Sequence, residues 1–286
     1  MPEGPEVETI RRGLARVALD RRITACRSDS SRVFHGAAAT EALAQVLVGA
    51  SIHSLGRHGK FLLADLARDG EVSGAVLILH MGMSGQLRSS ALSGTSAAAD
   101  KHAHLVLCFE DGSDVSFIDP RMFGRVELGV RPGPGELPAS LAHLGPDAIG
   151  APDPLARLGE RARRSSVAIK TLLLDQTLVA GIGNMYADEM LHRARLLPRR
   201  PASTLGAPEM ARLGSACREV LAEAVELGGS SLADRTYRDI SGELGSFQTK
   251  HRVYGREGEP CLECGEPVRR EVFGGRSSHY CPRCQS

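Results

Sequence analysis

The chain has 286 residues, of which 42% are hydrophobic and only 4% aromatic, and it contains no Trp. This length favours two domains with cores filled mainly by aliphatic side chains. A formal net charge of +1 does not by itself indicate a nucleic-acid partner. With no run of about 18 apolar residues and no basic-then-apolar leader, the sequence excludes a membrane-spanning protein and predicts a soluble, cytoplasmic one.

The first eight residues, MPEGPEVE, have unusual chemistry. Removal of Met1 leaves Pro2 with a free secondary amine, and an α-amino group with a pKa near ~8 is partly neutral and nucleophilic at pH 7. Such an amine forms a cationic iminium at a carbonyl carbon, which is a strong electron sink. Glu3 lies beside it and can transfer protons. The alternative is a loose leader that precedes a helix.

A helix is predicted directly after this segment. Pro5 suits the first helical turn, and apolar residues follow at helical spacing, at Val7, Ile10, Leu14 and Val17. This helix places Pro2 and Glu3 at its N-terminus, where an anion such as a DNA phosphate is favoured.

From about Ile23 to Leu128 the pattern changes to short β-rich runs, which predicts an antiparallel β-sandwich or flattened barrel. The clearest runs are Ser51–Leu55, Lys60–Leu66, Val76–His80, His104–Phe109 and Val115–Ile118. The small, polar stretch Ser89–Asp100 predicts a mobile surface loop.

Three places in this β region are candidate functional sites. Lys60 begins an apolar strand, a Gly-rich turn after His80 carries Met83, and a second turn displays Arg121 and Phe123. Apolar side chains on turns are the kind that wedge between DNA base steps. The alternative for each residue is an ordinary surface charge or core side chain.

Pro and Gly recur from Val130 to Pro154 without sustained periodicity, which is typical of a linker. The predicted organisation is a helix and β domain over residues 1–131, a linker over 132–154, a helical domain over 155–245 and a terminal finger over 246–286.

The helical domain contains a candidate phosphate site. Helical residues 167–174 lead to a turn that ends Gly-Ile-Gly-Asn184, and helices are predicted over Met185–Arg193 and Leu205–Leu227. Backbone N–H groups and the Asn184 amide at a helix N-terminus suit a phosphate, although an ordinary capped helical hairpin fits as well. Residues 155–204 carry nine basic and four acidic residues. Such a basic patch fits phosphate binding, but solvated helix faces have the same composition.

The C-terminus has the spacing of a zinc ribbon, Cys261-x2-Cys264 and Cys281-x2-Cys284. Four thiolates close a tetrahedral shell, so one zinc ion is predicted with a structural role. The remaining cysteines are scattered, which fits a reducing compartment. Between the two Cys pairs, two glycines predict a hairpin tip that leaves Arg276 free to bind a phosphate.

The sequence resembles the bacterial formamidopyrimidine-DNA glycosylase family, which repairs oxidised purines. The resemblance covers nearly the whole chain and is carried by MPEGPEVETIRRGL, RHGKFL, HMGMSGQL, DPRMFGR, LLLDQTLVAGIGNMYADE, FQTKHRVYGREGEPC and GGRSSHYCPRCQ. It implies an α+β fold with an N-terminal helix, an antiparallel β-sandwich, a helix–two-turn–helix domain and a zinc-ribbon hairpin. The implied enzyme is a monomeric bifunctional DNA glycosylase and abasic-site lyase that binds duplex DNA between its domains and needs no catalytic metal.

The resemblance also implies residue roles. Pro2 is the Schiff-base nucleophile at the sugar C1′ and Glu3 transfers protons, with Lys60 supporting the lyase steps that follow by β,δ-elimination. Asn184 and Arg276 grip the phosphates that flank the flipped nucleotide.

The implied DNA-binding set further includes His80 and three residues that fill the space left by the flipped base. In this wedge Met83 and Phe123 intercalate, while Arg121 reads the orphaned base.

Two alternatives stay open. Gly4 is more typical of endonuclease VIII, a sister family that removes oxidised pyrimidines, whereas the wedge residues and the approach to the zinc ribbon favour purine lesions. Residues 232–245 fall where the family has a loop that caps the everted base, and they do not reveal base preference. A silent zinc-ribbon protein that only binds nucleic acid would be expected to lack Pro2, Glu3 or Lys60, and all three are present.

Overall fold

The structure is a computed structural model that describes residues 2–29, 32–35, 40–133, 135–232 and 236–286. The expected removal of Met1, and part of the expected base-capping loop (residues 233–235), lie outside the described residues.

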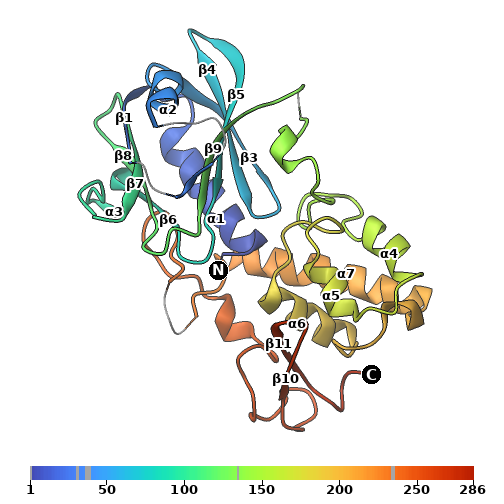
Figure 1. Cartoon of the computed structure of the whole chain (residues 1–286). Helices are drawn as coiled ribbons and strands as arrows, with labels where there is room; N and C mark the ends of the chain where they lie inside the picture. Colours follow the sequence, from blue (N-terminus) through green and yellow to red (C-terminus); the bar gives the residue numbers. More distant parts are fainter. Residues whose placement is uncertain (1, 30–31, 36–39, 134, 233–235) are drawn as a thin grey trace. The chain divides into compact units, whose positions relative to one another are not determined.

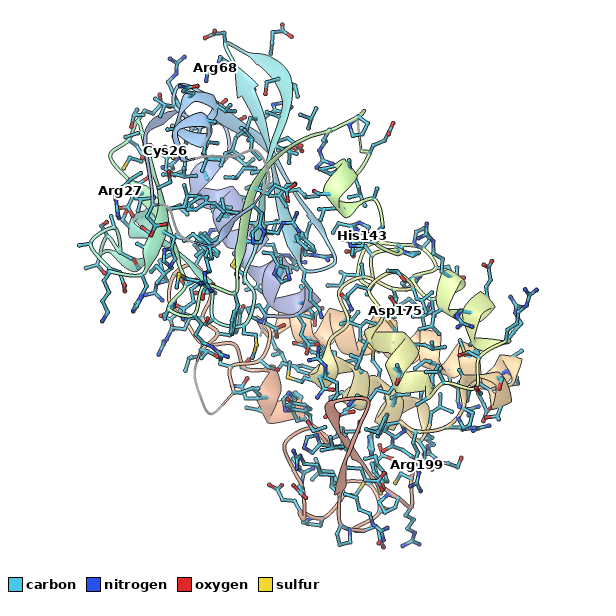
Figure 2. The ribbon with its side chains drawn as sticks, in the orientation of Figure 1. Cys26, Arg27, Arg68, His143, Asp175 and Arg199 are labelled. Atoms are coloured by element: carbon cyan, nitrogen blue, oxygen red, sulfur yellow. The ribbon has the colours of Figure 1, made fainter. Side chains whose placement is uncertain are left out.

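The chain forms two compact units. The N-terminal unit comprises Met1–Pro2, Glu6–Ala142 and Ser230–Gly245, and the C-terminal unit comprises Glu3–Pro5, His143–Gly229 and Ser246–Ser286. His143, where the chain enters the C-terminal unit after the β domain, is labelled in Figure 2. The division therefore falls inside the expected linker.

Two sheets build the N-terminal unit (Figure 1). One has the order β1 (Ile23–Ser28), β7 (Ala103–Phe109), β8 (Asp114–Ile118), β6 (Gln86–Ser89). The other has the order β2 (Phe34–His35), β9 (Arg125–Val130), β5 (Glu71–His80), β4 (Phe61–Arg68), β3 (Ser51–His58). All pairings are antiparallel except that of β2 with β9. The predicted antiparallel β-sandwich is confirmed.

Helix α1 (Gly4–Ala18) supplies part of the sandwich core. Its predicted apolar stripe is buried, and Ile10 and Leu14 belong to the same core cluster as Leu79 and Phe117 from the two sheets. Burying each such side chain contributes roughly 1.5–3 kcal/mol. The buried apolar side chains of α1 and of both sheets therefore share one core, which holds the two-sheet domain together.

The sequence did not predict helix α2 (Thr40–Leu47), which lies among the β-rich runs. Its C-terminal carbonyls are satisfied from outside the helix. The Arg68 guanidinium, at the end of β4, donates to the carbonyls of Val46 and Val48 at 3.0 Å (Figure 2). This cap comes from a residue 20 or more positions further along the chain, so local pattern could not reveal it.

The expected loop over residues 89–100 is partly helical. It contains the short helix α3 (Ser90–Ser93), which ends at Gly94 with φ of +74°. Ser89 at its start is fully buried, and its N–H donates to the Ile240 carbonyl at 3.0 Å.

Residues 230–245 join the N-terminal unit, whereas the sequence grouped them with the helical domain. The Ser230 N–H donates to Glu6 Oε1 at 2.7 Å. A Cβ at Gly13 would lie 2.3 Å from Ile240 Cγ2, so α1 and this segment approach closely where α1 carries glycine. These contacts join parts of the chain that lie far apart in the sequence.

The C-terminal unit is mainly helical. Its elements are the short 3-10 turns η2 (Ala202–Thr204) and η3 (Phe247–Lys250), the helices α4 (Ala156–Ala162), α5 (Ile169–Leu174), α6 (Asn184–Ala194) and α7 (Ala207–Glu226), and the hairpin β10 (Arg269–Phe273) and β11 (Arg276–Tyr280). The further turn η1 (Ala139–Leu141) precedes the unit. Helix α6 is buried along almost its whole length, so it is the central helix of the unit. Among the described residues, no helix is both long and apolar enough to cross a membrane.

Candidate functional site

The N-terminus of α6 holds the Glu3 carboxylate. Glu3 Oε2 accepts from the Gly183 N–H at 2.8 Å and from the Tyr186 N–H at 3.5 Å, while Oε1 accepts from the Met185 N–H at 3.1 Å. A Cβ at Gly183 would lie 2.2 Å from Glu3 Cδ, so only glycine allows this approach. The carboxylate next to Pro2 is thus fixed by a helix N-terminus, where negative charge is favoured.

This arrangement corrects the expectation of a backbone phosphate site at α6. Three N–H groups at this helix N-terminus, those of Gly183, Met185 and Tyr186, already donate to Glu3. The Asn184 side chain remains available there: its Nδ2 lies 3.5 Å from Ser277 Oγ, and its Oδ1 is buried without a hydrogen-bond partner in the part of the chain that the structure describes. Gly183, not Asn184, is the N-cap residue.

Gly4 is also tightly packed. Its N–H donates to the Gly181 carbonyl at 2.9 Å, and a Cβ would lie 3.2 Å from Ile149 Cδ1 and 3.3 Å from the Gly181 oxygen. A side chain at position 4 would therefore need Ile149 and the 181 turn to shift by a few tenths of an ångström.

Lys60 and His80 lie close together in the N-terminal unit. Lys60 is buried in the turn between β3 and β4, next to Gly59 with φ of +59°. Burial, with the nearby charges of Lys60 and Arg125, lowers the pKa of His80 from 6.5 to about 4. His80 Nδ1 accepts from the Gly82 N–H at 3.1 Å, which agrees with a neutral ring. The His80 imidazole is therefore uncharged at neutral pH, and the charge of Lys60 is one of the causes.

The turn that carries Met83 and the turn that carries Arg121 and Phe123 (the two wedge turns) are in contact. The buried Asp119 carboxylate accepts from Ser84 Oγ at 2.5 Å and from the Gly124 N–H at 2.6 Å. A Cβ at Gly82 would lie 2.3 Å from the Phe123 carbonyl oxygen, so the turns touch through their backbones.

The three predicted wedge side chains project from these joined turns. Met83 is 45% exposed and Phe123 is 54% exposed, and the Arg121 guanidinium lies 4.7 Å from the centre of the Phe123 ring. Large exposed apolar side chains on a rigid pair of turns are suited to insertion between stacked groups.

The zinc-ribbon hairpin carries Arg276 at its tip, as the glycine pair predicted. Gly274 and Gly275 have φ of +57° and +73°, and Arg276 is exposed at the first position of β11. A cavity of about 110 Å³ between α5 and the tip is lined by Lys170, Thr171 and Arg276, among others.

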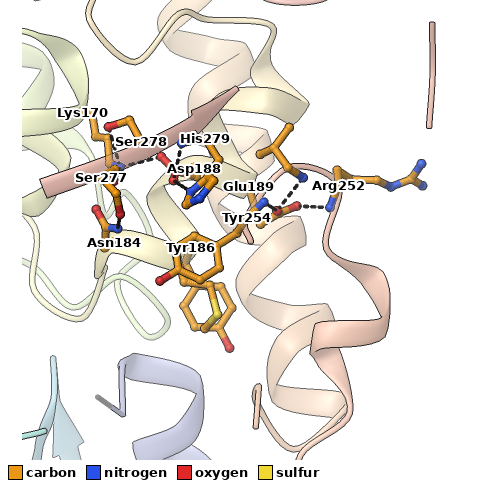
Figure 3. Close-up of polar contacts among 12 residues, drawn as sticks. Lys170, Asn184, Tyr186, Asp188, Glu189, Arg252, Tyr254, Ser277, Ser278 and His279 are labelled. Atoms are coloured by element: carbon orange, nitrogen blue, oxygen red, sulfur yellow. Dashed lines mark hydrogen bonds and ion pairs between the residues drawn. The ribbon is translucent and has the colours of Figure 1, made fainter. Parts of the chain in front are cut away.

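A buried ion pair beneath this hairpin was not predicted. Lys170 Nζ lies 2.6 Å from Asp188 Oδ1, and it also donates to the Ser277 carbonyl at 2.7 Å and to Ser278 Oγ at 2.8 Å (Figure 3). Asp188 Oδ2 accepts from the His279 N–H at 2.9 Å. Burial lowers the pKa of Lys170, while Asp188 acts in the opposite direction. The one signal in the sequence was Lys170 among the apolar residues of α5.

The four ribbon cysteines form a metal site. Their Sγ atoms all lie within 4.8 Å of one another, with Cys261 to Cys284 at 3.9 Å and Cys264 to Cys281 at 3.4 Å. A tetrahedron with Zn–S bonds of about 2.3 Å has S–S edges of about 3.8 Å, so the thiols fit one zinc ion. Because all four positions are filled by protein sulfur, this zinc is structural.

Three family descriptions match the chain. They are the formamidopyrimidine-DNA glycosylase N-terminal domain over residues 1–126, the formamidopyrimidine-DNA glycosylase H2TH domain over residues 144–236, and the zinc finger found in FPG and IleRS over residues 258–286.

Curated relatives agree over the full length. The formamidopyrimidine-DNA glycosylase of Geobacillus kaustophilus is 41% identical over 100% of both chains. That of Thermus thermophilus is 45% identical over 100% of this chain and 98% of its own.

Solved structures have the same fold. The MutM (Fpg) protein of Thermus thermophilus matches with a TM-score of 0.83 at 42% identity, covering 99% of this chain and 98% of that one. The Lactococcus lactis Fpg in complex with abasic-site DNA matches with a TM-score of 0.84 at 31% identity, covering 99% of each. With the Glu3 cap, the joined wedge turns and the four-thiolate site, these matches establish that the chain belongs to the formamidopyrimidine-DNA glycosylase family.

Proposed function

We propose that this protein is a bifunctional DNA glycosylase and abasic-site lyase that removes oxidised purines, 8-oxoguanine and formamidopyrimidines, from duplex DNA with Pro2 as the nucleophile. The observation that carries this proposal is the position of the Glu3 carboxylate. Glu3 follows Pro2 in the sequence, and three N–H groups, from the N-cap Gly183 and from α6, hold its carboxylate in place. A nucleophilic amine needs a proton-transfer group at a defined position, and this cap provides one.

The chemistry follows from a secondary amine. The Pro2 nitrogen forms a bond to C1′ while the bond from C1′ to the damaged base breaks, and the base leaves with a proton. Opening of the sugar gives a cationic iminium, which acidifies the proton on C2′. Loss of that proton expels the 3′ phosphate, and a second elimination expels the 5′ phosphate. Glu3 is the group that we assign to proton transfer at the sugar.

The other candidate residues bind DNA in this proposal. Lys60, Asn184 and Arg276 contact phosphates around the flipped nucleotide, because each offers a donor on a turn, helix end or hairpin tip. Met83, Phe123 and Arg121 occupy the space that the flipped base leaves. We place the work of the enzyme at the nucleoid, since its substrate is genomic DNA.

Purine rather than pyrimidine lesions are the favoured substrate. Gly4 was the residue that suggested oxidised pyrimidines. It packs against Ile149 and the Gly181 carbonyl, so its surroundings are other parts of the protein. The presence of Met83 and Phe123 favours purine lesions by the family resemblance, and both side chains are exposed where a wedge needs them.

The test is excision from two matched duplexes, one with 8-oxoguanine opposite cytosine and one with an oxidised pyrimidine. The proposal predicts faster cleavage of the purine duplex, with phosphates left on both sides of the gap. Preferential cleavage of the pyrimidine duplex would keep the chemistry but reject the substrate. Binding without cleavage of either duplex would reject the enzyme.

A further inference from the structure

One buried histidine lies against the zinc centre. The His192 side chain on α6 is 2% exposed, and its Nε2 lies 3.8 Å from Cys261 Sγ. One of its ring nitrogens also lies within 4.8 Å of Cys284 Sγ and of a Glu263 carboxylate oxygen. The imidazole therefore lies beside the four thiols, and it is not one of the four predicted zinc ligands.

A thiolate in this environment needs hydrogen-bond donors. One zinc ion with four thiolates has a net charge of −2, and Cys261 and Cys281 are buried. Cys281 Sγ accepts a backbone N–H from Cys284 at 3.4 Å. At Cys261 Sγ the neighbouring polar atom is His192 Nε2, which is a donor in the tautomer that carries the proton on Nε2.

We propose that His192 donates an N–H···S hydrogen bond to the Cys261 thiolate of the zinc centre, and so couples metal retention to the position of α6. His192 is a positioning residue: the metal keeps its four sulfur ligands, and the imidazole stabilises one of them from outside the shell.

The spacing along α6 supports this role. Asn184, Asp188 and His192 are four residues apart in turn, so they share one face of the helix. Asn184 contacts Ser277, and Asp188 accepts from the His279 N–H (Figure 3). With His192 on Cys261, this face contacts the zinc ribbon at three successive turns.

The contacts with the zinc ribbon span most of α6. Asn184 lies at the N-terminal end of this face and His192 near its C-terminal end, next to the metal site. A ribbon that shifts along α6 would have to break the His192 bond as well as the Asp188 bond. The inference does not depend on the proposed glycosylase chemistry, because it concerns metal retention alone.

The first experiment measures zinc transfer from the full-length protein to an excess of 4-(2-pyridylazo)resorcinol. His192→Phe keeps a buried ring but removes the donor, and it should lose zinc at least roughly tenfold faster than the unmodified protein. His192→Gln places an amide N–H near the position of Nε2 and should restore most of the retention. His143→Phe, at an exposed histidine of the same unit, is the matched control. Equal rates for His192→Phe and the unmodified protein would overturn the proposal.

A second experiment needs no variant and so does not depend on folding of His192→Phe. In protein that carries ¹¹³Cd in place of zinc, NMR should show a scalar coupling between ¹¹³Cd and the Nε2 proton of His192, transmitted through the N–H···S bond. Absence of this coupling would overturn the proposal. A direct one-bond coupling between ¹¹³Cd and a His192 nitrogen would also overturn it, because the imidazole would then be a ligand.

Discussion

The Glu3 carboxylate accepts a 2.8 Å hydrogen bond from the Gly183 N–H, across 180 residues of sequence. This bond places a negative charge at the positive end of α6 and leaves no room for a Cβ at residue 183. The position of the proton-transfer group beside Pro2 therefore depends on a glycine in the other half of the chain.

Gly183→Ala should displace Glu3 and slow base release by roughly 100-fold, because small misplacements of a catalytic group are costly. The measurement is the single-turnover rate on a duplex with 8-oxoguanine. Gly206→Ala is the matched control: Gly206 is also a helix N-cap, but its Cβ would meet Pro208 at an ordinary 3.6 Å. Equal rates for the two variants would contradict the role of the close approach.

Phe123→Ala should reduce excision at least roughly tenfold and change the free energy of unfolding by no more than about 0.5 kcal/mol. The ring is exposed, so it contributes little to the core, whereas a wedge needs it to stack on bases. Val72→Ala, at a comparably exposed residue of the same unit, should affect neither property. Unchanged excision by Phe123→Ala would remove this residue from the wedge.

The Glu8 carboxylate should contribute to the loss of fold stability at acidic pH. Burial raises its pKa, but hydrogen bonds and charges from Arg11, Arg12 and Arg57 outweigh this effect and lower it from 4.5 to about 2. A carboxyl with a lowered folded-state pKa stabilises the fold fully above about pH 4.5, and this stability is lost as the pH falls towards about 2.

Glu8→Gln should therefore lower the free energy of unfolding at pH 7 by about 1–2 kcal/mol, after discounting for the exposed partner Arg12, and should flatten its decline between pH 4.5 and pH 2. Denaturant unfolding across that pH range is the measurement. Glu71→Gln, at an exposed carboxylate of the same unit, serves as the control. A pH profile parallel to that of the unmodified protein would argue against the ion-pair cluster.

Lys170→Met should destabilise the C-terminal unit by about 3–5 kcal/mol, because it leaves Asp188 buried without its cationic partner. The double variant Lys170→Met with Asp188→Asn should recover part of that loss. Lys250→Met changes an exposed lysine of the same unit and should be neutral. Protection of β11 amides from hydrogen exchange reports the effect locally, and protection equal to that of the Lys250 variant would count against the buried pair.

The sequence predicted those features that depend on residues close together along the chain. The stripe at Ile10 and Leu14 predicted α1, and the Cys spacing predicted the metal site. Short β-rich runs bounded by turn signals predicted the strands of the sandwich.

Long-range contacts were beyond such patterns. Helix α2 is capped by Arg68, the N–H groups of α6 are occupied by Glu3 rather than an external anion, and Lys170 is paired with Asp188. Each contact depends on a partner that is distant in the sequence, so the residues next to it along the chain do not predict it.

The role of Pro2 as the nucleophile is tested by locating the covalent adduct with DNA. Protein freed of Met1 is mixed with a duplex containing 8-oxoguanine, reduced with borohydride, digested, and its modified peptide sequenced by mass spectrometry. We expect one deoxyribose-derived adduct on the Pro2 nitrogen, and none with Pro2→Gly blocked by N-terminal acetylation. An adduct on Lys60 or another lysine while Pro2 stays unmodified would contradict this role of Pro2.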